Sequence, residues 1–212
     1  MAEKTHINAE RYAELYQQSL DDPETFWAQQ ATEFLDWHQP WQQVLDHDYR
    51  QGHINWFQGG KLNVSVNCLD RHLAQRGDQI AILWEGDDPE QQSQLTYREL
   101  HHQVCKFANV LKAQGVKKGD RVCIYLPMIL EASVAILACC RIGAVHSIVF
   151  GGFSADALRD RIIDADCRVL ICADESYRGG KRVPSKINAD KAGLNPTRNC
   201  PSSGRHIRPG VG

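Results

Sequence analysis

The sequence predicts an α/β protein: an N-terminal helical and extended layer, followed by an incomplete, mainly parallel α/β subdomain. Two observations lead to this prediction. From Asp78 onward, short apolar runs alternate with helix-like segments, which is typical of parallel strands joined by right-handed βαβ crossovers. Before Asp78 the chain offers helix caps and then a stretch rich in Trp, Gly and Asp with little periodicity. We therefore expect three regions, at residues 1–77, 78–191 and 192–212.

The composition is that of a globular chain with one sizeable core. Of the 212 residues, 42% are hydrophobic and 24% charged, and the formal net charge is −2. This near-neutral balance argues against nucleic acid or a membrane surface as a partner. The N-terminus lacks the apolar run of a signal peptide, and the longest apolar region is interrupted by Pro127 and Glu131. The eight cysteines form no CxxC pair and sit mostly in apolar runs, which predicts a reducing, cytoplasmic location. Nothing in the sequence indicates an oligomeric state.

The N-terminal region should begin with two helices between Asn8 and Leu35. Asn8 is a suitable N-cap, and Pro23 fits the first turn of the second helix. The connection over 38–65 has many turn formers and reads as an extended layer. A single helix is then expected over 64–77, with Gly77 as a left-handed stop.

The second region should contain five strands. A pair is expected at 79–86 and 94–97, followed by a helix that opens with a Thr96–Glu99 capping box and closes at Gly115. The parallel strands and their helices are expected near 121–126, 131–141, 145–150, 154–165 and 168–173. The tail from Ala192 has few aliphatic residues and is predicted to be disordered.

Two glycine-containing segments follow strand ends, where parallel sheets bind ligands. "YRGGK" is either an exposed turn or a phosphate site. In the second interpretation Gly179 and Gly180 adopt positive φ and approach the ligand, while Arg178 and Lys181 supply positive charge. The segment is not a Walker A loop, because Arg182 follows the lysine.

"FGGFSADALRD" is open to two interpretations as well. It is either a tight strand-to-helix turn capped by Ser154, or a place where Gly151 and Gly152 bring backbone beside a flat ring close to Phe150. Spacing alone leaves both open.

Three histidines invite a catalytic or metal-binding interpretation, namely His101, His102 and His146. We expect them to be solvated or packed instead. No nucleophile elbow, Cys–His pairing or carboxylate dyad is recognisable.

Several segments resemble one family closely, among them "WFQGGKLNVSVNCLDRHL", "LTYRELHHQVCKFANVLK", "VFGGFSADALRDRI" and "ADESYRGGK". From Tyr12 to Lys191 the chain is similar to the acetyl-CoA synthetases, AMP-forming acetate–CoA ligases of the adenylate-forming superfamily. The resemblance implies acetate, ATP and CoA as substrates, Mg²⁺ as a cofactor, and a reaction through acetyl-adenylate. It assigns Arg178, Gly179, Gly180 and Lys181 to the CoA phosphates, and Phe150, Gly151 and Gly152 to the CoA adenine.

The chain departs from this family in three ways. Leu130 stands where the family usually has Pro, and Lys181 where Arg is frequent. The chain is also much shorter than the family, and its last residues do not match. Since the ATP, Mg²⁺ and acetate sites are expected to lie outside it, we expect no catalytic residue here and no acetyl-adenylate formation by this chain alone. The alternative is a non-catalytic CoA- or nucleotide-binding or interaction module.

Overall fold

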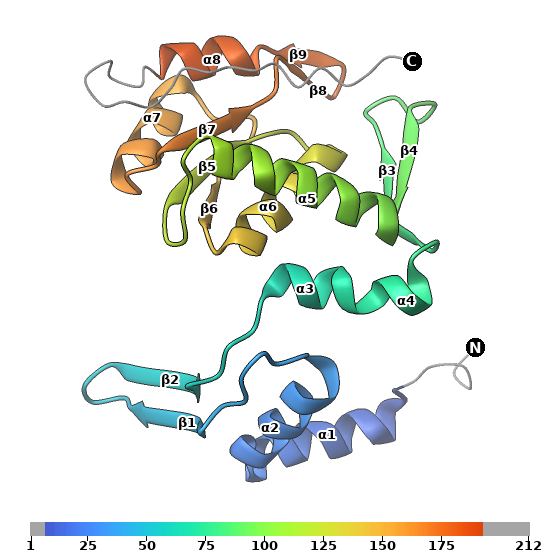
Figure 1. The fold of residues 1–212 in the computed structure, drawn as a ribbon, viewed down its shortest axis with the longest axis vertical. Coiled ribbons are helices and arrows are strands. Elements are labelled where there is room, and N and C mark those ends of the chain that lie inside the picture. Colours follow the sequence, from blue (N-terminus) through green and yellow to red (C-terminus); the bar gives the residue numbers. More distant parts are fainter. Residues whose placement is uncertain (1–6, 193–212) are drawn as a thin grey trace. The chain divides into compact units, whose positions relative to one another are not determined.

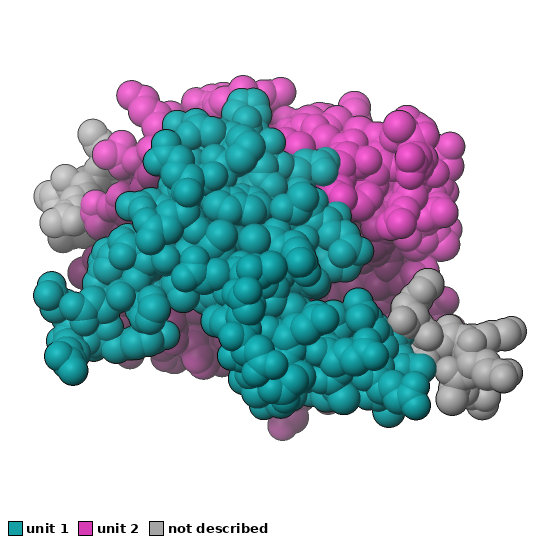
Figure 2. Space-filling model, turned by 90° about the horizontal axis from the view of Figure 1, so that it is seen from below, with its two compact units in different colours: residues 1–63 teal, residues 64–212 magenta. Residues whose placement is uncertain are grey.

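The structure, a computed structural model, describes residues 7–192. Contacts divide the chain into two compact units, Met1–Asn63 and Val64–Gly212, which Figure 2 colours separately. The boundary between the two units therefore lies earlier in the chain than the boundary after Gly77 that the sequence predicted. The predicted disorder of the tail concerns 193–212, which lie outside the described residues.

The first unit begins with the two predicted helices, which are confirmed. They are α1 (Ala9–Asp21) and α2 (Pro23–Phe34). The side chain of Asn8 accepts a hydrogen bond from the Arg11 amide at 2.8 Å, so it is the N-cap of α1. Asp22 caps α2 in the same way, accepting from the Thr25 amide at 3.0 Å.

The extended segment of the first unit is a β-hairpin. Its strands are β1 (Gln43–Asp48) and β2 (His53–Gln58), which pair antiparallel. Extended backbone was expected here, but the pairing was not. Aromatic side chains pack within this unit, with ring centroids 4.9 Å apart for Trp37 and Trp41 and 5.1 Å apart for Trp41 and Phe57.

The helix expected over 64–77 is broken into shorter pieces, and the reason expected for its end is wrong. The pieces are α3 (Val64–Cys68), the 3₁₀ turn η2 (Asp70–His72) and α4 (Leu73–Arg76). Gly77 has φ −52°, which is right-handed. A Cβ there would lie 2.6 Å from the Leu73 carbonyl oxygen and 2.4 Å from the Arg98 guanidinium, so the glycine is required by close packing.

A hairpin and a long helix follow as predicted. They are β3 (Ile80–Glu85), β4 (Gln92–Thr96) and α5 (Tyr97–Ala113), and the strands pair antiparallel. The capping box is present, since the Thr96 hydroxyl accepts from the Glu99 amide at 3.2 Å and the Glu99 carboxylate accepts from the Thr96 amide at 2.8 Å. Gly115 ends the helix with φ +83°.

The predicted parallel sheet is confirmed. Its strands are β5 (Arg121–Tyr125), β6 (Val145–Ile148) and β7 (Val169–Cys172), in the spatial order β6-β5-β7, and they alternate with α6 (Leu130–Ile142) and α7 (Ala155–Asp164). Ser154 caps α7, as expected. Leu130, where the resemblance predicts a proline, is the first residue of α6, so helix geometry accommodates it.

Both faces of this sheet are covered, which follows from the alternation of side chains along β5. Val122 and Ile124 point into a core shared with α5 and α6. Cys123 and Tyr125 point into a second core with Leu158 of α7. Figure 1 shows α5 and α6 on one side of the sheet and α7 on the other.

Another hairpin and a last helix follow β7, and neither of these elements was predicted. They are β8 (Ser176–Arg178), β9 (Lys181–Val183) and α8 (Ser185–Lys191). Within residues 7–192, every helix is too short or too polar to cross a bilayer.

Candidate functional site

A cleft opens at the carboxyl ends of the three parallel strands. Its walls come from residues within 84–91, 103–110, 126–134, 148–152 and 171–183. The segments that follow β5, β6 and β7 therefore meet here, as the sheet topology predicts. The cleft has a volume of about 1900 Å³. A typical small-molecule pocket holds roughly 300–1000 Å³, so this cleft has room for a large, extended ligand.

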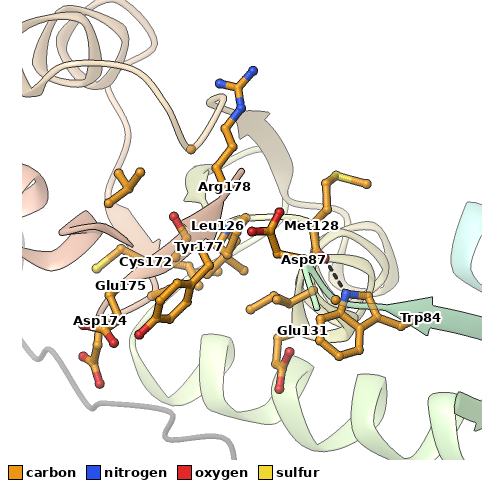
Figure 3. A pocket seen from close by; sticks show the side chains of 18 of the residues that line it. Trp84, Asp87, Leu126, Met128, Glu131, Cys172, Asp174, Glu175, Tyr177 and Arg178 are labelled. Carbon is orange, nitrogen blue, oxygen red and sulfur yellow. Dashed lines mark hydrogen bonds between the residues drawn. The ribbon is translucent and has the colours of Figure 1, made fainter. Parts of the chain in front are cut away.

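Figure 3 shows 18 of the side chains that line the cleft, with Arg178 among them. The Arg178 guanidinium lies over the Phe150 ring, with its carbon 4.8 Å from the ring centroid. Such a contact at an exposed site stabilises the position of a flexible cation by about 0.5–1 kcal/mol. The two segments singled out in the sequence thus meet in space.

Gly152 is the residue that lets them meet. A Cβ at this position would lie 2.8 Å from the Phe150 ring and 3.1 Å from the Arg178 guanidinium. Gly151 has more room, since a Cβ there would lie 3.5 Å from the nearest atom, the Leu126 carbonyl oxygen. Of these two glycines, only Gly152 is therefore closely approached by other side chains.

The "RGG" segment is the turn of the β8–β9 hairpin. Gly179 and Gly180 have φ +55° and +72°, which is the two-residue turn that suits the twist of paired strands. Arg178 and Lys181 are direct cross-strand partners, so two cations flank the turn. Like charges in this arrangement repel each other unless an anion lies between them. Within residues 7–192, neither side chain is ion-paired with a carboxylate.

An unexpected partner binds the backbone of this turn. The Gly179 amide donates to Asp87 Oδ1 at 3.0 Å, and the Gly180 amide donates to Asp87 Oδ2 at 2.7 Å. The two amides, Gly180 first, hold the pKa of the Asp87 carboxyl below its usual value. The glycine amides that the sequence offered for phosphate are thus engaged by a carboxylate of the same chain.

Two contributors to the cleft were missed in the sequence. Asp87 lies between the strands expected at 79–86 and 94–97, in a segment for which the sequence predicted no ligand role, and it reaches a turn 92 residues further on. Trp84 donates its indole N–H to the Met128 carbonyl at 2.6 Å and so fixes the loop after β5 (Figure 3). No local pattern signals either contact.

His101 lies outside the cleft, in a polar network. Its Nε2 is 3.0 Å from a guanidinium nitrogen of Arg141, 3.4 Å from Asp70 and 3.5 Å from the Cys105 sulfur. All three contacts use the same ring nitrogen. In a catalytic triad the imidazole uses one nitrogen for the nucleophile and the other for the acid, and these contacts do not have that arrangement. His146 is half-buried, with Nδ1 3.9 Å from the Cys140 sulfur. Both histidines are therefore partly buried and in contact with neighbouring side chains.

The described residues offer no set of metal ligands. Between positions 7 and 192, no three His, Cys, Asp or Glu side chains are arranged to hold a metal ion.

The parallel sheet thus carries a ring, an arginine over that ring and a second cation at its carboxyl edge, where sheets of this kind bind ligands. Comparison with protein families agrees. The family model described as AMP-binding enzyme matches residues 69–205, and that described as acetyl-coenzyme A synthetase N-terminus matches residues 12–68. The chain belongs to the AMP-binding enzyme family.

Relatives of this chain are acetyl-coenzyme A synthetases. It is 64% identical to the one from Alkalilimnicola ehrlichii over 190 residues, which are 90% of this chain and 30% of that protein. It is 65% identical to the one from Magnetococcus marinus over 186 residues, which are 88% of this chain and 29% of that protein. Acetyl-coenzyme A synthetase 2 of Pseudomonas aeruginosa is 58% identical over 199 residues, 94% of this chain and 30% of that protein. The chain therefore spans about 30% of the length of these relatives.

Proposed function

We propose that this chain carries the CoA-binding part of an AMP-forming acetate–CoA ligase. The observation that carries the proposal is the placement of Arg178 on the Phe150 ring at the carboxyl edge of the sheet. The relatives are acetyl-coenzyme A synthetases, and their name indicates the acyl group and the thiol substrate. In the whole protein, acetate and ATP would form acetyl-adenylate and pyrophosphate. The CoA thiol would then take the acetyl group and release AMP.

The chemistry of CoA supports these roles. Its phosphates need cations, and Arg178 offers a planar fork while Lys181 offers a compact charge across the hairpin. A bound phosphate would relieve the repulsion between these two side chains. Its adenine needs a flat apolar surface, and the Phe150 side chain is 52% exposed.

The test replaces Arg178 in a full-length ligase, made by joining this chain to the remainder of the Alkalilimnicola ehrlichii relative. Arg178→Ala should raise the CoA requirement of thioester formation and leave acetate-dependent ATP–pyrophosphate exchange unchanged. Losing one charge-assisted phosphate contact should weaken CoA binding about tenfold to a hundredfold. Arg178→Lys should recover part of the loss, because the charge returns without the fork.

Arg182→Ala is the matched control, since Arg182 lies on the same hairpin but pairs with Glu175. It should change the CoA requirement little. Equal losses in both half-reactions for Arg178→Ala would refute the proposed role and make the loop structural. CoA binding without thioester formation by the fusion would favour the non-catalytic module instead.

A further inference from the structure

We propose that Asp87 is a positioning residue for the ligand loop. Its carboxylate clamps the Gly179–Gly180 turn and so fixes where Arg178 and Lys181 present their charges. The clamp itself is read from the contacts of the described chain. Its consequence for CoA rests on the function proposed above.

The geometry of the contact is that of a clamp. Each carboxylate oxygen of Asp87 accepts one hydrogen bond, from successive glycine amides at 3.0 and 2.7 Å. Two parallel bonds fix orientation as well as distance. The contact joins the β3–β4 hairpin to the β8–β9 hairpin across one end of the cleft, where Figure 3 shows Asp87 among the lining side chains.

The β8–β9 hairpin needs such a support. Each of its strands has only three residues, and an isolated two-stranded hairpin of this kind is marginally stable. The charges of Arg178 and Lys181 face each other and weaken it further. Tyr177 contributes little burial, because its side chain is 59% exposed. Without the clamp, the turn and both cations would sample several positions.

The β3–β4 hairpin is a firm base for the clamp. Its loop is closed by hydrogen bonds from the Gly86 amide to the Gln91 carbonyl at 2.8 Å and from the Gln91 amide to the Asp88 carbonyl at 2.9 Å. Leu95 of β4 is buried in the main core. Asp87 thus lies at the tip of a hairpin that is anchored in the core, and its hydrogen bonds order the glycine turn.

The neighbouring aspartate has a different role. Asp88 Oδ1 accepts from the Glu90 amide at 3.0 Å, inside its own loop. An asparagine at position 88 would keep this single bond, because it retains one acceptor oxygen. An asparagine at position 87 would lose one of two bonds and point an N–H₂ group at a glycine N–H. Asp87→Asn and Asp88→Asn are therefore a matched pair, of which only the first breaks the clamp.

The first experiment needs no ligand and uses the 212-residue chain. In Asp87→Asn, amide hydrogen exchange at Gly179 and Gly180, followed by NMR, should accelerate about three- to tenfold. The Arg178 side-chain protons should also lose the upfield ring-current shift that the Phe150 ring imposes, as they would in Phe150→Leu. Asp88→Asn should match wild type in both measurements. Unchanged exchange and an unchanged Arg178 shift in Asp87→Asn would overturn the clamp.

The second experiment measures CoA binding by calorimetry in the full-length fusion. A positioning role predicts that Asp87→Asn weakens CoA binding about three- to tenfold, with Asp88→Asn within about twofold of wild type. Tighter binding in Asp87→Asn would overturn the proposal, because it would mean that phosphate competes with the carboxylate for the amides. Asp87→Glu should restore slow glycine exchange in part, since it keeps both acceptors.

The two proposals fail in different ways. If wild type binds no CoA, or if Arg178→Ala binds it equally well, the proposed function is wrong. The exchange and ring-current measurements then still decide whether Asp87 positions Arg178. If Arg178→Ala weakens CoA binding and Asp87→Asn does not, only the positioning role is wrong.

Discussion

An ion pair ties α6 to the segment before α4, and its removal should destabilise the second unit. The Arg141 guanidinium donates to Asp70 Oδ2 at 2.8 Å and to Oδ1 at 2.6 Å, so the pair is bidentate. The same guanidinium donates to the hydroxyl of Ser65, which is fully buried, at 3.1 Å. We predict that Asp70→Asn lowers the free energy of unfolding at neutral pH.

The magnitude follows from the exposure of the pair. The side chains of Arg141 and Asp70 are 21% and 30% exposed, so the pair is neither buried nor at the surface. Breaking a fully buried pair costs about 3–5 kcal/mol, and an exposed pair contributes about 0–1 kcal/mol. For this partly exposed pair we expect a loss of about 1.5–3 kcal/mol, the range of hydrogen bonds to charged groups. Asp78→Asn is the control, because Asp78 and its partner Arg98 are 89% and 60% exposed. It should cost less than about 1 kcal/mol.

The pH dependence gives a second, independent check. The hydrogen bonds from Arg141 hold the pKa of Asp70 below its ordinary value in the folded chain. A carboxyl whose folded pKa is lowered stabilises the fold above its unfolded pKa, about 3.9, and this stabilisation is lost as pH falls through the folded pKa. The difference between wild type and Asp70→Asn should therefore shrink below about pH 4.

The assay is urea unfolding at a series of pH values, with hydrogen exchange of α6 amides to report on the second unit. A difference that does not shrink in acid would refute the assignment to the Asp70 charge. So would an Asp78→Asn variant that loses as much stability as Asp70→Asn.

Two further predictions concern the core. Leu111→Ala should destabilise the second unit by about 2–5 kcal/mol, because Leu111 is 1% exposed. Val110→Ala on the same helix should change stability by less than about 0.5 kcal/mol, because Val110 is 48% exposed. Equal urea midpoints for the two variants would contradict this difference. Burial raises the pKa of Cys139 to about 12, so iodoacetamide at pH 8 should leave Cys139 unmodified in the native chain while it labels the exposed Cys68. Peptide mass spectrometry that finds equal labelling at both would contradict this.

Much of the second unit could be predicted because its signals are local. The Thr96–Glu99 capping box defines the start of α5, and the apolar run at 121–126 defines β5. The break in the helix expected over 64–77 could not be predicted in this way. The role of Gly77 depends on the approach of Arg98, a residue from a later helix. The β1–β2 hairpin was missed because its turn lacks a strong hairpin dipeptide.

The candidate site could likewise be predicted only in part. Both glycine segments follow strand ends, so parallel topology alone predicts that they meet at the carboxyl edge. The Asp87 clamp could not be predicted, because an acidic residue in a turn is ordinarily interpreted as solvated. The β8–β9 pairing was missed for the same reason, because three-residue strands carry too short a pattern to detect.

The two cations that flank the turn are not equivalent, and this bears on the lysine that replaces a frequent arginine. The guanidinium carbon of Arg178 lies over the Phe150 ring, 4.8 Å from its centroid. The planar fork of N–H groups can in addition hold a phosphate bidentately, whereas an ammonium group offers only a compact charge. Lys181 lies across the hairpin, where a compact charge suffices to share an anion with Arg178. Under the proposed function, position 178 therefore requires an arginine for both contacts, whereas position 181 requires only a positive charge.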